Sequence, residues 1–160
     1  MRAKALYTFG YEGISIEDFV ARLRKVGVRT VLDVRQLPLS RKRGFSKNSL
    51  ATTLHSRGIL YAHLPALGCP RPTRDRYRVD GDWAAYVNAF STYLDAQQKA
   101  VSELAQVAQK TTACLVCFEA DFARCHRSLV ARATTRAGGP QVIHLTATGE
   151  IPELARRVAA

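Results

Sequence analysis

The stretch ACLVCFEADFARCHRSLVARATTRAGG, residues 113–139, contains the pattern that decides the fold. Its first six residues form a continuous apolar run, which is typical of a strand buried on both faces. Residues 125–137 carry a helical pattern, and the two glycines that follow end it. A buried strand connected to a helix in this way is one unit of a parallel α/β sheet.

The same alternation of short apolar runs and helical patterns continues outward in both directions. We predict further strands at residues 5–9, 30–34, 59–64 and 142–145. We predict helices at 15–26, at 46–57, at 83–107 as one long helix or a broken pair, and at 151–160, with a long loop at 65–81. The sequence thus predicts an α/β fold for a single domain over residues 1–160. Its three layers would enclose a mostly parallel, roughly five-stranded, Rossmann-like sheet.

Positive charge is concentrated in two segments of the chain. The 160 residues include 24 Lys and Arg against 13 Asp and Glu, a net charge of +11. Much of the excess lies at 41–47 and 71–78, which both read as loops. This clustering favours a polyanionic partner, a nucleotide or a nucleic acid, over charge that only keeps the protein in solution.

The sequence also indicates where in the cell the protein is located. No run approaches the roughly 20 apolar residues that span a bilayer, and the first residues lack the pattern of a secretion signal. Four cysteines without such a signal indicate reduced thiols rather than a disulfide framework. We therefore expect a cytoplasmic protein with no membrane partner, and the sequence leaves its oligomeric state open.

Polar residues stand where the predicted strands end. Tyr11 and Glu12 follow the first strand, Asp33 and Arg35 close the second, and Glu119 follows the fourth. Ligands of open parallel sheets bind outside the carboxyl ends of the strands, so we expect these side chains to converge on one site. The alternative is an ion pair, such as Asp33 with Arg35, that only holds loops together.

The helix start at residues 125–128 is a candidate anion site. Its free backbone N–H groups favour an anion, to which Arg127 would add a forked donor and Ser128 a hydroxyl. The same field would favour a thiolate at Cys125, so a cysteine nucleophile next to His126 is an alternative. The arginine that closes a phosphatase loop is missing, because Ala131 stands at its place.

Metal binding receives less support. Cys114 and Cys117 are three apart on a strand and point to opposite faces, whereas two zinc thiolates must converge. Asp33, Glu119 and Asp121 offer hard oxygen ligands that suit a divalent metal such as magnesium. The sequence requires no cofactor, and it leaves that metal open.

Four ordered motifs resemble a known family. They are YTFGYEGISIEDF at 7–19, VLDVRQLPLSRKRGFSK at 31–47, GILYAHLPALGCPR at 58–71 and CFEADFARCHRS at 117–128. With them the chain closely resembles the domain-of-unknown-function 488 family over nearly its whole length. The resemblance implies a compact α/β protein but no activity. It also implies that the family's shared residues correspond here to Tyr11, Glu12, Asp33, Arg35, Ser40, Phe45, Glu119, Cys125, His126 and Arg127.

Together these features predict an enzyme that acts on a phosphorylated substrate such as a nucleotide or nucleic acid, by hydrolysis of a phosphodiester or N-glycosidic bond. The catalytic candidates are Asp33, Glu119, Cys125 and His126, and the substrate-binding candidates are Tyr11, Glu12, Arg35, Ser40, Arg71, Arg127 and Ser128. Two alternatives stay open. One is a nucleic-acid-binding protein without catalysis, and the other is a Cys125-dependent transferase or phosphatase.

Overall fold

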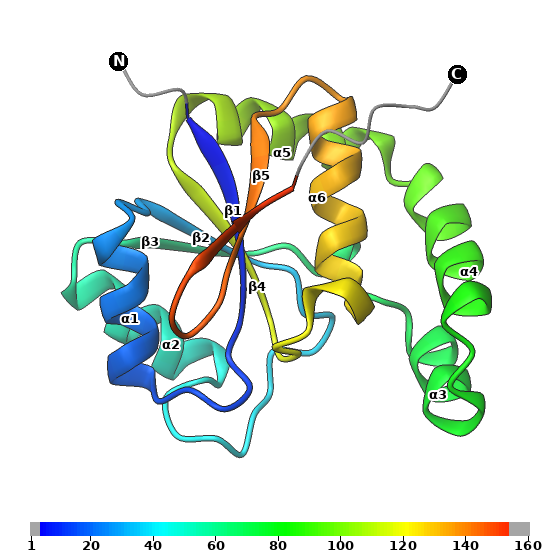
Figure 1. The fold of residues 1–160 in the computed structure, drawn as a ribbon, viewed down its shortest axis with the longest axis horizontal. Helices are drawn as coiled ribbons and strands as arrows, with labels where there is room; N and C mark the ends of the chain where they lie inside the picture. Colours follow the sequence, from blue (N-terminus) through cyan, green and yellow to red (C-terminus); the bar gives the residue numbers. More distant parts are fainter. Residues whose placement is uncertain (1–3, 154–160) are drawn as a thin grey trace.

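The computed structural model describes residues 4–153 and shows an α/β fold built on one open sheet (Figure 1). Six strands make up the sheet in the order β3-β2-β4-β1-β5-β6. They are β1 (Ala5–Gly10), β2 (Thr30–Asp33), β3 (Leu60–His63), β4 (Ala113–Cys117), β5 (Gln141–Leu145) and β6 (Glu150–Pro152). All neighbours pair in parallel except β5 and β6. The predicted mostly parallel α/β sheet is therefore confirmed, with one strand more than expected.

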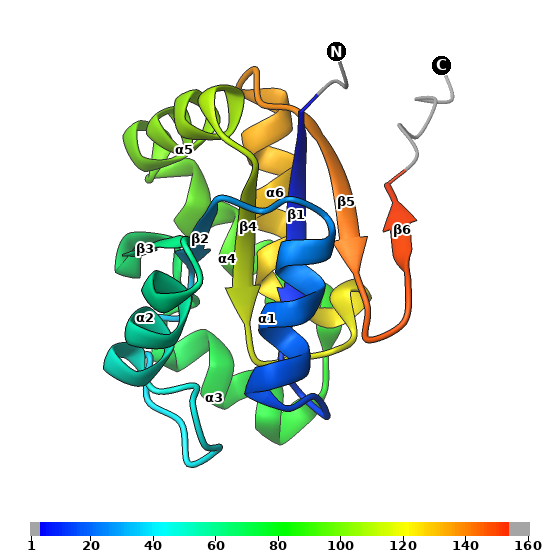
Figure 2. The same cartoon turned by 90° about the vertical axis from the view of Figure 1, so that its left-hand side faces the viewer.

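Helices cover both faces of the sheet and complete three layers. On one face lie α1 (Ile16–Lys25) and α2 (Lys47–Ser56), whose apolar side chains join one core cluster. On the other face lie α4 (Trp83–Asp95), α5 (Gln98–Lys110) and α6 (His126–Arg136), which share a second cluster. Figure 2 views the first face, with α1 and α2 in front of the strands. Every residue of β4 is buried between the two clusters, which explains its unbroken apolar run.

Helix α1 shows how the capping residue and the spacing of apolar residues determine where a helix begins and which face it buries. Ser15 caps the helix, because its Oγ accepts a hydrogen bond from the backbone N–H of Asp18 at 3.1 Å. The buried residues of α1 are those with helical spacing, Ile16, Phe19, Val20 and Leu23. Ring stacking between Phe19 and Phe9 of β1, with centroids 4.7 Å apart, fixes the helix on the sheet.

The predicted loop at 65–81 is wrong, because most of it is helical. A short 3-10 turn, η1 (Pro65–Leu67), is followed by α3 (Arg71–Asp80). No residue of α3 is buried, so the helix has no apolar stripe that the sequence pattern could reveal. Exposed pairs at i,i+4 spacing, Arg71 with Asp75 and Arg76 with Asp80, run along it instead.

Two further expectations at the helical segments have different outcomes. The long pattern at 83–107 is a broken pair, α4 and α5, with the break at Ala96 and Gln97. The terminal helix expected at 151–160 is wrong at its start, because Glu150–Pro152 form β6 and pair with β5. The remainder of that segment lies outside the described residues. Within residues 4–153, none of the helices combines the length and the apolar character that a bilayer crossing needs.

The strand order creates a crevice at the carboxyl ends of the central strands. β4 lies between β2 and β1. The chain leaves β1 toward α1 on one face, and it leaves β4 through η2 (Phe122–Arg124) toward α6 on the opposite face. The two exits diverge, and a divergence of this kind is where open α/β sheets bind their ligands.

Candidate functional site

A cavity of about 510 Å³ lies at this crevice. It is bounded by the loops after β1, β2 and β4, by one side of α3 and α4, and by the start of α6. Its lining residues are Tyr11, Arg35, Gln36, Leu37, Leu39, Ser40, Arg41, Cys69, Arg74, Tyr77, Arg78, Trp83, Tyr86, Cys117, Phe118, Glu119, Arg124, Cys125 and His126. The volume is within the range of small-molecule sites. We call this cavity the rim pocket.

The rim pocket is strongly positive. Among residues 4–153, its lining contains five arginines and a single carboxylate, Glu119. Arg41, Arg78 and Arg124 are exposed, and Arg74 is half-buried with its Nη2 donating to Gln36 Oε1 at 3.1 Å. The Nε of Arg74 is buried and has no hydrogen-bond partner among the described residues. Guanidinium groups in this number favour a ligand with more than one negative charge.

Asp33 holds Arg35 in place rather than facing the pocket. The Asp33 side chain is fully buried, and its carboxylate accepts from Arg35 Nε at 2.9 Å and Nη2 at 2.7 Å, and from the hydroxyl of Tyr61. Burial opposes the charge of Arg35, but the bonds to Asp33 outweigh it and raise the arginine's pKa above its usual range. Burial and the bond to Asp33 likewise raise the pKa of Tyr61. The Asp33 carboxylate is thus paired with Arg35 and Tyr61 and does not line the rim pocket, an arrangement that suits a positioning residue.

The other side of Arg35 is also occupied. Its Nη1 donates to Tyr11 Oη at 3.1 Å and to the Phe45 carbonyl at 2.6 Å. Tyr11 stacks on Phe45 with ring centroids 4.3 Å apart, and both side chains are buried. Ser40 lines the same wall of the pocket. Four of the five N–H groups of Arg35 are therefore used inside the protein, and one remains for a ligand.

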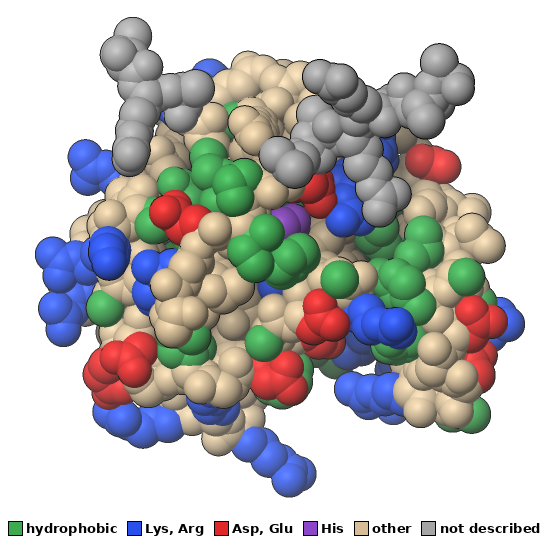
Figure 3. Space-filling model, in the orientation of Figure 1, with side chains coloured by type: hydrophobic (Ala, Val, Ile, Leu, Met, Phe, Trp, Pro, Cys, Tyr) green, Lys and Arg blue, Asp and Glu red, His purple; other side chains and the backbone are tan. Residues whose placement is uncertain are grey.

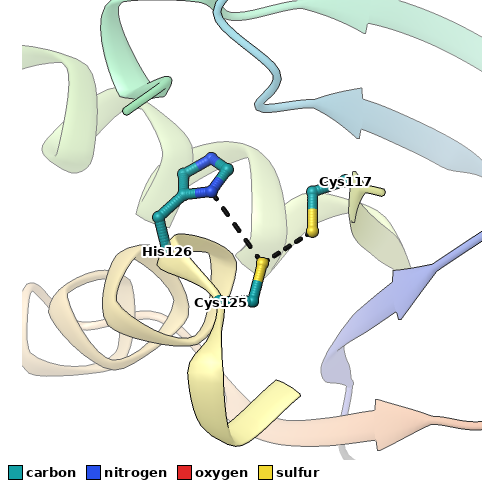
Figure 4. A group of neighbouring side chains, drawn as sticks. All are labelled: Cys117, Cys125 and His126. Atoms are coloured by element: carbon teal, nitrogen blue, oxygen red, sulfur yellow. Dashed lines mark hydrogen bonds between the residues drawn. The ribbon is translucent and has the colours of Figure 1, made fainter. Parts of the chain in front are cut away.

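At the floor of the rim pocket, two thiols and an imidazole meet (Figure 4). Cys117 ends β4, Cys125 caps α6 and His126 is the first residue of that helix. The Sγ atoms of the two cysteines are 2.7 Å apart, and Glu119 Oε2 lies 3.3 Å from Cys117 Sγ and 3.4 Å from Cys125 Sγ. His126 Nδ1 is 3.9 Å from Cys125 Sγ. Burial, followed by the contact with Cys125, raises the pKa of the Cys117 thiol well above its ordinary value.

Arg127 and Ser128 face the interior instead of the pocket. Arg127 is fully buried, and its guanidinium donates to the carbonyls of Glu119 and Ala120 and, at 3.0 Å, to Cys117 Sγ. The Ser128 hydroxyl donates to the carbonyl of Phe122. Both side chains hold the loop between β4 and α6. The forked donor and the hydroxyl expected at an anion pocket are therefore not available there.

Glu12 and Arg71, two other predicted binding residues, also lie outside the rim pocket. Glu12 is exposed, and its Oε1 accepts from the backbone N–H of Ala120 at 3.1 Å, which ties the loop after β1 to the loop after β4. Arg71 is exposed at the start of α3 and pairs with Asp75 at 3.4 Å. The structure thus gathers Tyr11, Arg35, Ser40, Glu119, Cys125 and His126 at one cavity and leaves the other candidates beside it.

Comparison with known protein families gives one result. The family described as domain of unknown function DUF488 matches residues 15–134. The chain belongs to that family. Neither the curated proteins nor the solved structures yield a match. The matched residues of this DUF488 protein extend from the cap of α1 into α6 and so include most of the rim pocket.

Sequence reasoning missed several pocket residues of this DUF488 chain. Trp83 and Tyr86 were expected only as core and Tyr77 lay in the predicted loop, yet the three rings form the wall contributed by α3 and α4. Trp83 stacks on Tyr86 with centroids 4.7 Å apart. Cys117 was considered as a metal ligand only together with Cys114, although the thiol next to it belongs to Cys125, which follows the next loop. The signal that could have found it is that Cys117 and Glu119 share one face at the end of β4.

Proposed function

We propose that the protein is an enzyme that binds a phosphorylated, nucleotide-type substrate in the rim pocket and hydrolyses it. The observation that carries the proposal is the lining of that pocket, where five arginines surround a single carboxylate beside a thiol and an imidazole. Arginines without an equal number of carboxylates favour binding of a phosphate group, and Glu119, the carboxylate in the lining, would transfer the proton.

The phosphate groups would bind to the arginines that have N–H groups to spare. Arg41 comes from the loop after β2, Arg78 from α3 and Arg124 from the turn before α6, so they approach the cavity from three sides. The space-filling view shows the wider setting: basic side chains project along its lower margin, where Figure 1 places the loop after β2 (Figure 3). Such a rim would attract a polyanion before it binds.

An aromatic wall supports a substrate that carries a planar base. Trp83 is half-buried, and it stacks on Tyr86 while Tyr77 packs against both rings at centroid distances of 5.6 and 5.3 Å. Stacking on aromatic side chains is a common, sequence-tolerant way to hold nucleobases. The wall lies on α3 and α4, and Arg78 belongs to the same pair of helices. Base and phosphate could therefore be held by a single supporting element.

Glu119 would perform the proton transfer. Its carboxylate would take a proton from a water molecule, whose oxygen then attacks the phosphorus or the anomeric carbon. The bond to the leaving group breaks, and the carboxylic acid returns the proton to it. The peptide groups next to Glu119 are fixed by Arg127, which donates to the Glu119 and Ala120 carbonyls. Such anchoring would restrict the position of the carboxylate.

Substrate binding can be followed with the single tryptophan of the chain, because Trp83 lines the pocket. We expect nucleoside diphosphates and short oligonucleotides to quench its fluorescence. Replacing Arg78 by Gln should weaken this binding about 10- to 150-fold, since a charge-assisted hydrogen bond contributes about 1.5–3 kcal/mol. Arg76→Gln is the matched control, because Arg76 lies on the same helix but pairs with Asp80 outside the rim pocket. Equal loss in the two variants would remove the proposed phosphate contact.

Turnover separates the enzyme from a protein that only binds nucleic acid. Purified protein would be incubated with nucleotides and oligonucleotides, and the products would be separated by chromatography. Glu119→Gln should abolish hydrolysis while fluorescence quenching by the same ligands persists. Quenching without any hydrolysis by the wild-type chain would favour the non-catalytic alternative.

One observation favours a second candidate, Cys125-dependent group transfer. His126 Nδ1 faces the Cys125 thiol at 3.9 Å, and a base beside a thiol is the arrangement of a cysteine nucleophile. The phosphatase version stays unsupported, since Arg132, the next arginine of the helix, pairs with Glu153 at 2.8 Å instead of lining the pocket. Mass spectrometry of the protein quenched during turnover distinguishes the two chemistries. A covalent adduct on Cys125 would establish this candidate, and its absence during hydrolysis would support Glu119.

A further inference from the structure

Side chains from two elements form a compact group of metal-type donors below the rim pocket. The sulfurs of Cys117 and Cys125 and one ring nitrogen of His126 all lie within 4.8 Å of one another, and all three residues are buried. Figure 4 shows Cys125 between the other two, with its sulfur pointing toward both. Two sulfurs and one imidazole nitrogen form a donor set that is typical of zinc.

The hydrogen bond of His126 gives an independent indication. His126 Nε2 lies 2.7 Å from the Val34 carbonyl oxygen, which can only accept, so this nitrogen must carry the proton. Nδ1 of the neutral ring is then left with a lone pair, and it is the nitrogen that faces Cys125. Metal-ligating histidines almost always donate their second N–H to a carbonyl or carboxylate in this way. The loop after β2 therefore sets the ring in the form and direction that a metal needs.

The surroundings match the charge of a metal thiolate centre. Arg127 Nη1 donates to Cys117 Sγ at 3.0 Å, a contact that stabilises a thiolate. Glu119 Oε2 approaches both sulfurs within 3.4 Å from the pocket side. A divalent cation, two thiolates, the Glu119 carboxylate and the Arg127 guanidinium together carry no net charge. A buried site is most favourable when its charges cancel in this manner.

We propose that Cys117, Cys125 and His126 bind one Zn²⁺ through two thiolates and one imidazole nitrogen, with the fourth position open toward the rim pocket. Binding releases the two thiol protons and forms two Zn–S bonds. Tetrahedral zinc with Zn–S bonds of about 2.3 Å separates its sulfurs by about 3.7 Å. The two Sγ atoms, now 2.7 Å apart, would therefore move apart by about 1 Å.

Cys114 takes no part in this site. It is fully buried on the other side of β4, in the cluster that packs against α1 and α2, and its thiol contacts the Leu115 carbonyl. The expectation that Cys114 and Cys117 do not share a zinc ion thus agrees with the geometry. The proposed pair is Cys117 with a cysteine from the following loop, which the spacing along one strand could not reveal.

The test is metal binding by the whole chain, purified under reducing conditions and stripped with a chelator. We expect about one Zn²⁺ per chain by elemental analysis. Co²⁺ in its place should give the intense near-ultraviolet band of cobalt–thiolate bonds together with the visible bands of a tetrahedral ion. Cys117→Ser and Cys125→Ser should each weaken zinc binding by more than about 100-fold, since loss of an outer partner alone weakens it about 10–100-fold.

Cys69→Ser is the matched control, because Cys69 is a buried thiol of the same pocket that lies outside the donor group. Zinc binding should survive that substitution. A reduced wild-type chain that takes up no Zn²⁺, a cobalt spectrum without thiolate bands, or equal loss in Cys69→Ser would each overturn the proposal. Should a serine variant fail to fold, cobalt titration of the wild-type chain still decides. The site stands apart from the proposed function, because failed zinc binding leaves nucleotide quenching of Trp83 unaffected.

Discussion

Replacing Asp33 by Asn tests whether this carboxylate is structural. The Asp33 side chain is fully buried and Arg35 is 6% exposed, so the ion pair has almost no access to water. The variant keeps the shape of the side chain but removes its charge. In either orientation the amide NH₂ faces donors, which are Arg35 Nη2 and the Tyr61 hydroxyl at one position and Arg35 Nε and backbone N–H at the other. Arg35 would then be a buried cation without a counter-ion.

The size of the expected loss of stability follows from the burial of the Asp33–Arg35 ion pair. Removing one partner of a buried ion pair destabilises a protein by about 3–5 kcal/mol, a large share of the roughly 5–15 kcal/mol that folds a typical domain. With a urea m-value of about 2 kcal/mol/M, the unfolding midpoint should fall by about 1.5–2.5 M. Urea titration monitored by circular dichroism measures this directly. Nucleotide binding should weaken as well, since Arg35, which donates to the Tyr11 hydroxyl, loses the carboxylate that holds it.

Asp95→Asn serves as the control, because Asp95 is exposed at the end of α4 and its loss of charge should leave the midpoint nearly unchanged. A second comparison adds Arg35→Gln to Asp33→Asn. The double variant should lose less stability than the sum of the two single variants, since it leaves no unpaired buried charge. If Asp33→Asn unfolded at the wild-type urea concentration but had lost all turnover, the structural role would be refuted and a proton-transfer role restored.

Three further predictions concern parts of the fold around the site. Gly10→Ala should lower the stability by about 1–3 kcal/mol, because a Cβ there would overlap the Glu119 carbonyl, whereas a Cβ at Gly149 would meet only Thr146 Oγ1 at an ordinary 3.7 Å, so Gly149→Ala should melt near the wild-type temperature. Ser15→Ala should cost about 0.5–2 kcal/mol in urea unfolding through loss of the cap of α1. Burial lowers the pKa of His144 in the folded protein, so as the pH falls the unfolded chain binds a proton at this residue before the folded protein does. The free energy of unfolding should therefore be highest above about pH 6.5 and decline as the pH falls below that value. His144→Gln should flatten that decline, and an unchanged pH slope would contradict the assignment.

Much of the fold could be predicted because the sheet is buried on both faces. The apolar run of β4 and the amphipathic spacing of α1 reflect burial directly, and burial patterns are what a sequence displays best. The position of polar residues at the strand ends was enough to predict that Glu119, Cys125 and Arg35 meet at one rim of the sheet. The helix α3 could not be predicted, because none of its residues is fully buried and Tyr77 alone among its apolar side chains packs against the core, while charge pairs run along its surface.

The side-chain roles within the site were harder to predict than their location. A helix start favours anions through its backbone, but the backbone does not decide where Arg127 points. In this chain Arg127 points inward, where its guanidinium donates to the carbonyls of Glu119 and Ala120 beside Gly10. For Asp33, too, the sequence predicted the position of the residue but not the partners of its side chain. Its position at a strand end was informative, while its partner Tyr61 comes from the neighbouring strand β3.

The central position of β1 has a consequence for synthesis on the ribosome. Both of its neighbours, β4 and β5, come from residues 113–145, so β1 is translated well before either strand it pairs with. The nascent strand β1 must therefore wait, without its native partner strands, until residues 113–117 have emerged, and long-range parallel pairing is slow to form. Incomplete chains would expose an apolar edge open to aggregation, so quality control by chaperones would matter most before β4 appears.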